Sequence, residues 1–106
     1  MADDTPCTTE DGRYLLINGR RWRATDPMLP EEVGRRLRRH LMAARREVGV
    51  ALRAADEGAE RRARRRVHAA KTALGERGTP WWEQSDEERR ERWEAGLATL
   101  DEGDGA

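Results

Sequence analysis

Two short runs, Arg13-Tyr14-Leu15-Leu16-Ile17 and Arg20-Arg21-Trp22-Arg23-Ala24, predict a β-hairpin at residues 13–24. Asn18-Gly19 separates its two halves, and both residues tolerate the positive φ angles that a two-residue type I′ turn requires. This turn fixes a register of four pairs: Ile17 with Arg20, Leu16 with Arg21, Leu15 with Trp22 and Tyr14 with Arg23. The first face carries Leu15, Ile17 and Trp22, and the second carries Tyr14, Leu16, Arg21 and Arg23. Because a lone hairpin is marginally stable in water, we expect the first face to pack on helices.

Apolar residues spaced by three and four positions predict helices at residues 30–55 and 58–76. The stripe of the first helix is Val33, Leu37, Leu41, Ala44, Val48, Leu52 and Ala55. The stripe of the second is Ala59, Ala63, Val67, Ala70 and Leu74. Pro30 and the acids after it favour a helix start, while Gly75 and Gly78 favour a helix end.

The segment Asp56-Glu57-Gly58 is the expected break between these helices, which would then form an antiparallel hairpin. The alternative is one continuous helix, since a glycine inside a helix costs only about 1 kcal/mol. The second stripe is rich in alanine and buries little area. We therefore expect the β-hairpin, the tryptophans or a second copy of the chain to cover the pair.

The last part of the chain predicts a tryptophan-capped turn and a short third helix. Gly78-Thr79-Pro80-Trp81-Trp82 is the turn, and Ser85 with Glu88 forms a capping box for a helix at residues 85–100. Residues 1–12 and 101–106 are expected to be disordered acidic ends flanking a single domain at residues 13–100. The predicted fold class is α+β, mostly α, with the β-hairpin at 13–24 packed on the helical hairpin.

Four short segments resemble a family of short bacterial proteins found in actinobacteria and proteobacteria. They are Gly19–Pro27 (GRRWRATDP), Leu41–Arg46 (LMAARR), Ala70–Gly78 (AKTALGERG) and Pro80–Glu83 (PWWE). Some members of that family carry the name "biopolymer transporter Tol". The resemblance spans roughly residues 13–83. It implies no particular activity and assigns no functional residue.

Charge is unevenly distributed along this highly charged chain. Charged residues make up 40% of it and apolar residues 36%, so each helix can contribute only a narrow stripe to the core. Residues 13–77 contain 18 basic and eight acidic residues, a net charge of +10, whereas residues 78–106 carry a net charge of −6. All basic residues but Lys71 are arginines, which is typical of a GC-rich genome. Arginine abundance alone is therefore weak evidence for phosphate binding.

The residues that enzymes need are scarce, so we expect a protein without catalytic activity, metal or cofactor. His40 and His68 lie among arginines and are expected at the surface or at its boundary. Cys7 lies in an acidic stretch that would not lower the pKa of a thiol. The chain shows neither an apolar run of about 18 residues nor a signal-peptide pattern. We therefore expect a cytoplasmic protein without membrane insertion.

Arginines and tryptophans are the candidate binding residues. Four arginines share the helix face opposite the first apolar stripe, and two more lie on the second face of the hairpin. Trp81 and Trp82 either cap the helix pair or leave one indole exposed for stacking. The candidate surface is Arg21, Arg23, Arg35, Arg39, Arg46, Arg53, Trp81 and Trp82. Its alternative interpretation is a solvated helix face.

The preferred function is a non-enzymatic interaction or scaffold module that self-associates through its helices, most simply as a homodimer, or binds a protein partner. The alternative is a nonspecific nucleic-acid-binding accessory protein. In that case the arginine-rich helix faces would follow a phosphate backbone.

Overall fold

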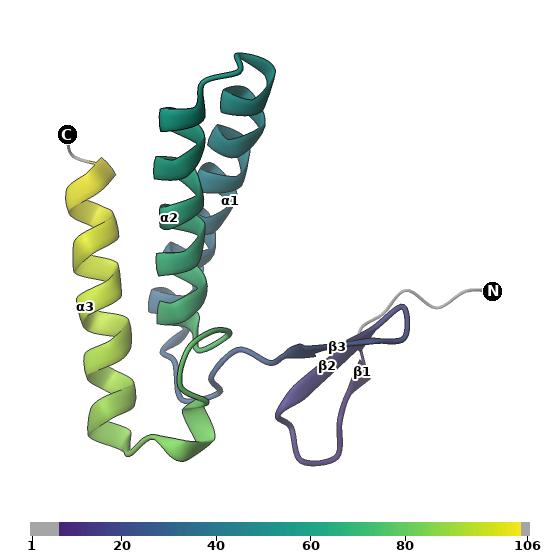
Figure 1. Ribbon diagram of the computed structural model, residues 1–106. Coiled ribbons are helices and arrows are strands. Elements are labelled where there is room, and N and C mark those ends of the chain that lie inside the picture. The colour runs from purple at the N-terminus through teal and green to yellow at the C-terminus, as the bar shows by residue number, and fades with distance from the viewer. Residues whose placement is uncertain (1–6, 105–106) are drawn as a thin grey trace.

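The protein is an α+β molecule in which a small antiparallel sheet precedes three helices (Figure 1). The computed structural model describes residues 7–104. The strands are β1 (Cys7–Thr8), β2 (Tyr14–Ile17) and β3 (Arg20–Arg23). The helices are α1 (Glu31–Arg53), α2 (Glu57–Leu74), the short 3₁₀ helix η1 (Trp81–Glu83) and α3 (Asp86–Asp104). The predicted fold class is therefore confirmed.

The β2–β3 hairpin has the register that its turn residues predict. Leu15 pairs with Trp22, and the turn residues Asn18 and Gly19 have φ angles of 51° and 77°. The sheet has a third strand, because β1 pairs antiparallel to β2. The prediction of a disordered arm is thus wrong for residues 7–12, and residues 1–6 lie outside the described part. A tight turn places β1, since Thr9 N donates to the Tyr14 carbonyl at 2.9 Å.

Helices α1 and α2 form the antiparallel hairpin, not one long helix (Figure 1). The chain reverses at Ala55, whose φ is 55°, and Asp56 then caps α2 by accepting from Ala59 N at 3.0 Å. The break thus comes slightly earlier than the predicted segment Asp56-Glu57-Gly58, and Gly58 lies inside α2. The glycine at position 75 ends α2 in the left-handed conformation, with φ 86°.

Helix α3 begins at the predicted capping box and extends further than expected. Ser85 N donates to the Glu88 carboxylate at 2.8 Å, and Glu88 N donates to the Ser85 hydroxyl at 3.1 Å. The helix ends at Asp104, so a disordered tail is the wrong prediction for residues 101–104, and residues 105–106 lie outside the described part. The anchor is Asp101, which accepts hydrogen bonds from His40 Nε2 at 2.7 Å and from Arg36.

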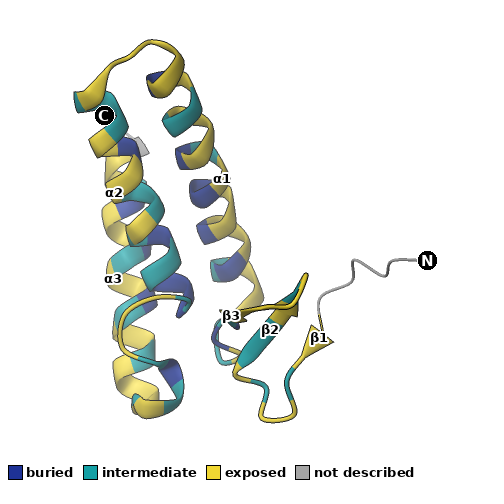
Figure 2. Ribbon diagram, turned by 45° about the vertical axis from the view of Figure 1, so that its right-hand side comes forward, coloured by how far each residue is buried: buried dark blue, intermediate teal, exposed yellow. Residues whose placement is uncertain are grey.

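The core lies where α3 packs on one side of the α1–α2 pair (Figure 2). Helix α3 therefore provides the cover that the alanine-rich stripe of α2 requires. A close approach at Gly96 makes this contact tight, because a Cβ there would lie 2.6 Å from the Cβ of Ala73. The buried cluster is Leu37, Leu41, Ala70, Ala73, Leu74, Trp93, Leu97 and Leu100.

The sheet projects to the side of the helices and does not lie flat against them (Figure 1). Its first face is consequently only half-buried: Trp22 is 39% exposed, contrary to the expected packing. The second face is in contact as well, because the Tyr14 and Trp82 rings meet edge to face at 5.6 Å. Arg23 adds a hydrogen bond to the Gly78 carbonyl at 2.6 Å. The sheet is thus attached to the helices mainly through the start of β2 and the end of β3.

A buried carboxylate fixes the segment that leads from the sheet into α1. Asp26 is 2% exposed, and its backbone N–H donates to the Leu74 carbonyl at 3.0 Å. Its side chain accepts from Arg89 Nε at 2.9 Å and from Arg92 Nη2 at 2.6 Å. Burial would raise the pKa of the Asp26 carboxyl, but the hydrogen bonds from Arg89 and Arg92 outweigh burial and leave the pKa lowered. This network joins the entry to α1, the end of α2 and the start of α3.

Candidate functional site

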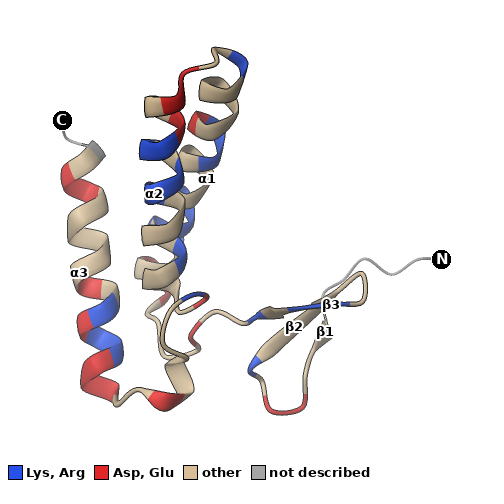
Figure 3. Ribbon diagram, in the orientation of Figure 1, with Lys and Arg blue, Asp and Glu red and all other residues tan. Residues whose placement is uncertain are grey.

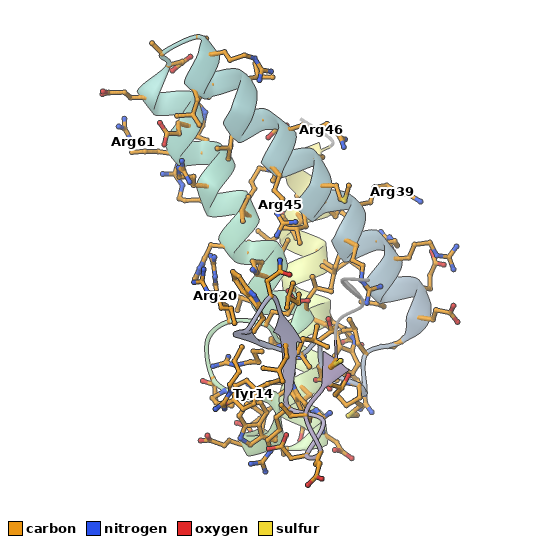
Figure 4. All side chains as sticks on the ribbon, turned by 90° about the vertical axis from the view of Figure 1, so that its right-hand side faces the viewer. Tyr14, Arg20, Arg39, Arg45, Arg46 and Arg61 are labelled. Atoms are coloured by element: carbon orange, nitrogen blue, oxygen red, sulfur yellow. The ribbon has the colours of Figure 1, made fainter. Side chains whose placement is uncertain are left out.

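A groove runs between the sheet and the face of the α1–α2 pair that is turned away from α3 (Figures 1 and 4). Its volume is about 450 Å³. We call it the basic groove, and its lining residues are Trp22, Arg45, Val48, Arg64, Val67, Lys71 and Arg77. They come from β3, from both long helices and from the segment after α2. The groove therefore exists only because the sheet stands beside the helix pair.

Helical spacing places apolar groups on the floor of the basic groove and cations on its rim. Arg64, Val67 and Lys71 follow each other at intervals of three and four in α2, so they share one face. Arg45 and Val48 have the same relation in α1. Both valines are half-buried between the helices, whereas Arg45 and Arg64 are exposed. The two helix faces thus present an apolar strip with cations beside it.

The wall of the basic groove is the indole of Trp22, which lies between two cations. The Arg20 guanidinium lies 4.2 Å from the ring centroid, and Lys71 Nζ lies 5.5 Å from it. Such distances are typical of cation–π contacts. The contact with Lys71 reaches α2 across the groove, and Trp22 remains 39% exposed.

Four of the seven lining residues are cations and none is acidic. Two of the cations have polar neighbours: Arg64 Nε donates to the Glu60 carboxylate at 2.7 Å, and Arg77 Nη1 lies 3.4 Å from His68 Nδ1. The Glu60 carboxylate compensates only part of the positive charge, so the groove keeps an excess of cations. This excess favours an anionic ligand.

The excess of positive charge affects the pKa of Lys71. Burial lowers the pKa of its ammonium group; Glu76 acts in the opposite direction, and the nearby Arg77 and Arg45 lower the pKa further. The repulsion among these three cations is relieved when an anion binds among them. A carboxylate or a phosphate in the basic groove would accordingly raise the pKa of Lys71 again.

The four predicted arginines of α1 lie outside the basic groove. Arg35, Arg39, Arg46 and Arg53 are all exposed, and Arg35 forms a 3.0 Å ion pair with Glu32. Figure 4 shows that Arg39 and Arg46 extend from the side of α1 away from α2, whereas Arg45 lies over the helix pair near the sheet. The structure thus separates the predicted arginine stripe from the cations of the groove.

The other predicted residues meet in an aromatic cluster at the base of the sheet. Trp81 and Trp82 are in edge-to-face contact at 5.2 Å. Arg23 lies 5.7 Å from the Trp82 ring, and Arg21 lies 4.1 Å from the ring of Tyr14. The indole N–H of Trp81, which is 8% exposed, donates to the Ala24 carbonyl at 3.0 Å. Trp81 is buried and Trp82 is half-buried. The cluster attaches the sheet to the helices.

The histidines and the cysteine differ in their surroundings. His68 is exposed, as predicted, whereas His40 is 6% exposed and bonds to Asp101. The expectation that His40 lies at the surface or at its boundary is thus wrong, and its partner Asp101 lies 61 positions further along the chain. Hydrogen bonding from His40, together with Arg36, holds the pKa of the Asp101 carboxyl below its usual value. Cys7 is exposed in β1.

Charge is distributed over the helices as Figure 3 shows, with basic residues along α1 and α2 and acidic residues at both ends of α3. Within residues 7–104, no group of three His, Cys, Asp or Glu side chains is arranged to hold a metal ion. In the same range, no helix has both the length and the apolar character that a membrane crossing requires.

Sequence reasoning missed the cations that line the basic groove: Arg45, Arg64, Lys71 and Arg77. Three of them flank the apolar stripes of their helices, and Arg77 follows α2. On the helices, the sequence-based prediction considered only the arginines on the face opposite the apolar stripe. One signal was available, since Lys71 is the single lysine among 21 basic residues. Its compact ammonium group differs from the planar guanidinium of arginine. The exposure of Trp22 had no such signal.

Comparisons with protein-family models, curated proteins and solved structures find no match to this chain.

Proposed function

We propose that the protein is a non-enzymatic interaction module, and that its basic groove binds an acidic helical segment. The observation that carries this proposal is the arrangement of four cations around an apolar floor that is open to solvent. Val48 and Val67 form the floor, and Trp22 forms the wall. A ligand that fits must combine carboxylates with an apolar stripe.

An amphipathic helix has this combination of groups. Two antiparallel helices leave a groove between them, and a third helix packs there with its side chains between theirs. Recognition of an amphipathic helix in a groove is a common mode of peptide binding. Carboxylates on both sides of the ligand's apolar stripe would reach Arg45 on α1 and Lys71 on α2 together.

A nucleic-acid backbone is the competing ligand, because the arginines on α1 are exposed over several turns. Phosphate contacts alone would leave the apolar floor uncovered, and the exposed arginines Arg39 and Arg46 lie away from the groove. Binding of a nucleic acid through its phosphates would depend on every exposed arginine to a similar extent. Binding in the groove depends on the cations that line it.

The test is a titration with a fluorescently labelled synthetic helix of about 20 residues, which spans about 30 Å. This probe carries glutamates beside a stripe of leucine and alanine. We expect the wild-type protein to bind it and the double variant Arg45→Gln/Lys71→Gln to lose at least tenfold in affinity. The matched control is Arg39→Gln/Arg46→Gln, which removes the same charge from the other side of α1 and should change the affinity less than twofold. Equal losses of peptide affinity in both double variants would contradict the proposal.

A labelled DNA duplex serves as the second probe, and its binding is measured at two salt concentrations. Duplex binding that survives physiological salt and weakens in the control variant would instead support the nucleic-acid function. Its logarithmic salt dependence would have a slope of about 0.9 for each phosphate contact.

A further inference from the structure

The outward face of α3 lies on the opposite side of the molecule from the basic groove (Figure 1), and most of its exposed charged residues are acidic. Spacings of three and four residues bring its acids onto one face. The exposed members of this acidic face are Glu87, Glu91, Glu94 and Glu102, with the exposed Ala95 and Ala98 between them.

Two of the three arginines of α3 turn away from this face. Arg89 and Arg92 turn inward and bind Asp26. Arg90 is exposed and lies three residues after Glu87 and four before Glu94, so it is a neighbour of both glutamates on the helix surface. Four glutamates against one arginine leave the acidic face with an excess of negative charge.

We propose that α3 of a second copy of this chain occupies the basic groove. This inference rests on the proposed function and names the partner. The two surfaces are complementary in charge, because glutamates on one meet four cations on the other. They are also complementary in form: Ala95 and Ala98 are small enough for the helix to approach the valines of the floor.

The position of the two surfaces determines the symmetry of the assembly. Because they lie on opposite sides of one protomer, a pair that uses one contact leaves a groove free at one end and an acidic face free at the other. Association is therefore head to tail, and it continues into a ring or an open chain instead of closing as a two-fold dimer. Exposed charges drive it, so salt weakens it.

Complementation between two variants tests this assembly. The groove variant is Arg45→Gln/Lys71→Gln/Arg77→Gln, and the helix variant is Glu87→Gln/Glu91→Gln/Glu94→Gln. Sedimentation of the wild-type protein at low salt should give a mass that rises with concentration above the 12.1 kDa of one chain. Each variant alone should remain at 12.1 kDa. Their equimolar mixture should stop at twice that mass, because it holds one intact groove and one intact acidic face.

Arg39→Gln/Arg46→Gln is the control for the loss of positive charge, and it should still assemble like the wild type. Circular dichroism checks that every variant keeps its helices. A wild-type protein that stays at 12.1 kDa at every concentration overturns this inference, and so does a mixture of variants that does not combine. If the protein does not self-associate but the synthetic acidic helix binds in the groove, the proposed function is supported and only the identity of the partner is wrong. If neither binds, both are wrong.

Discussion

Replacing Asp26 with asparagine should destabilise the protein strongly. The substitution keeps the size of the side chain and one acceptor oxygen, but it removes the negative charge between Arg89 and Arg92. These two side chains are only 14% and 9% exposed, so water can replace little of the lost interaction. The variant therefore leaves two poorly hydrated cations facing a neutral amide.

The size of the effect follows from that geometry. Removing one partner of a buried ion pair costs about 3–5 kcal/mol. Because asparagine can still accept one hydrogen bond, we expect the lower end, about 3 kcal/mol. Domains of this size unfold with a free energy of about 5–15 kcal/mol, so this is a large fraction of the total. The melting temperature should fall by roughly 10–20 °C.

The dependence on pH gives the prediction a second readout. The pKa of Asp26 in the folded protein lies below its ordinary value of 3.8, so its charged form stabilises the fold above that value. This stabilisation is lost as the pH falls below 3.8 toward the pKa of the folded state. The difference between wild type and Asp26→Asn should accordingly be largest at neutral pH and shrink in acid.

Urea unfolding followed by far-ultraviolet circular dichroism measures both effects. The matched control is Glu32→Gln, which removes a carboxylate from a 3.0 Å ion pair with Arg35 whose side chains are 65% and 61% exposed. That substitution should cost less than about 0.5 kcal/mol. Equal losses for Asp26→Asn and Glu32→Gln at neutral pH would show that the buried network contributes no more stability than an exposed ion pair.

Three further substitutions test the packing. Trp22→Ala should cost about 1–2 kcal/mol in urea unfolding, less than the roughly 3–5 kcal/mol of a core tryptophan, because the indole is 39% exposed. Trp81→Phe should cost about 1–3 kcal/mol, since a buried carbonyl loses its donor, and a neutral result would exclude that hydrogen bond. Gly96→Ala should cost about 1–3 kcal/mol, because the added methyl group would clash with Ala73. Gly103→Ala is the control: its methyl group would meet nothing within 4 Å, so it should stabilise the helix slightly. A melting temperature that rises in both variants would contradict the close approach at Gly96.

The elements of this protein could be predicted because local residues determine them. The turn at Asn18-Gly19 fixes the register of its hairpin, and Ser85 with Glu88 fixes the start of α3. The strand β1 escaped prediction because it spans two residues and depends on pairing with β2. The last turn of α3 escaped prediction because Asp101 is held by residues of α1 that are distant in the sequence.

The candidate site was harder to predict, because it depends on how the sheet and the helices are placed relative to each other. Periodicity identified the arginines opposite the apolar stripe, but it could not show that the sheet would stand beside the other flank of the helix pair. The exposure of Trp22 follows from that placement alone. The sequence left two interpretations open for Trp81 and Trp82, and in the structure the first is buried and the second half-buried.

The most direct test of the basic groove as a binding site is the nuclear magnetic resonance signal of the indole N–H of Trp22. The protein has four tryptophans, and the variant Trp22→Phe identifies which indole signal belongs to Trp22. Upon addition of the synthetic acidic helix, the Trp22 signal should shift progressively, while those of the buried Trp81 and Trp93 stay in place. Binding that shifts the Trp82 signal and leaves Trp22 unchanged would place the ligand on the aromatic cluster and contradict the account.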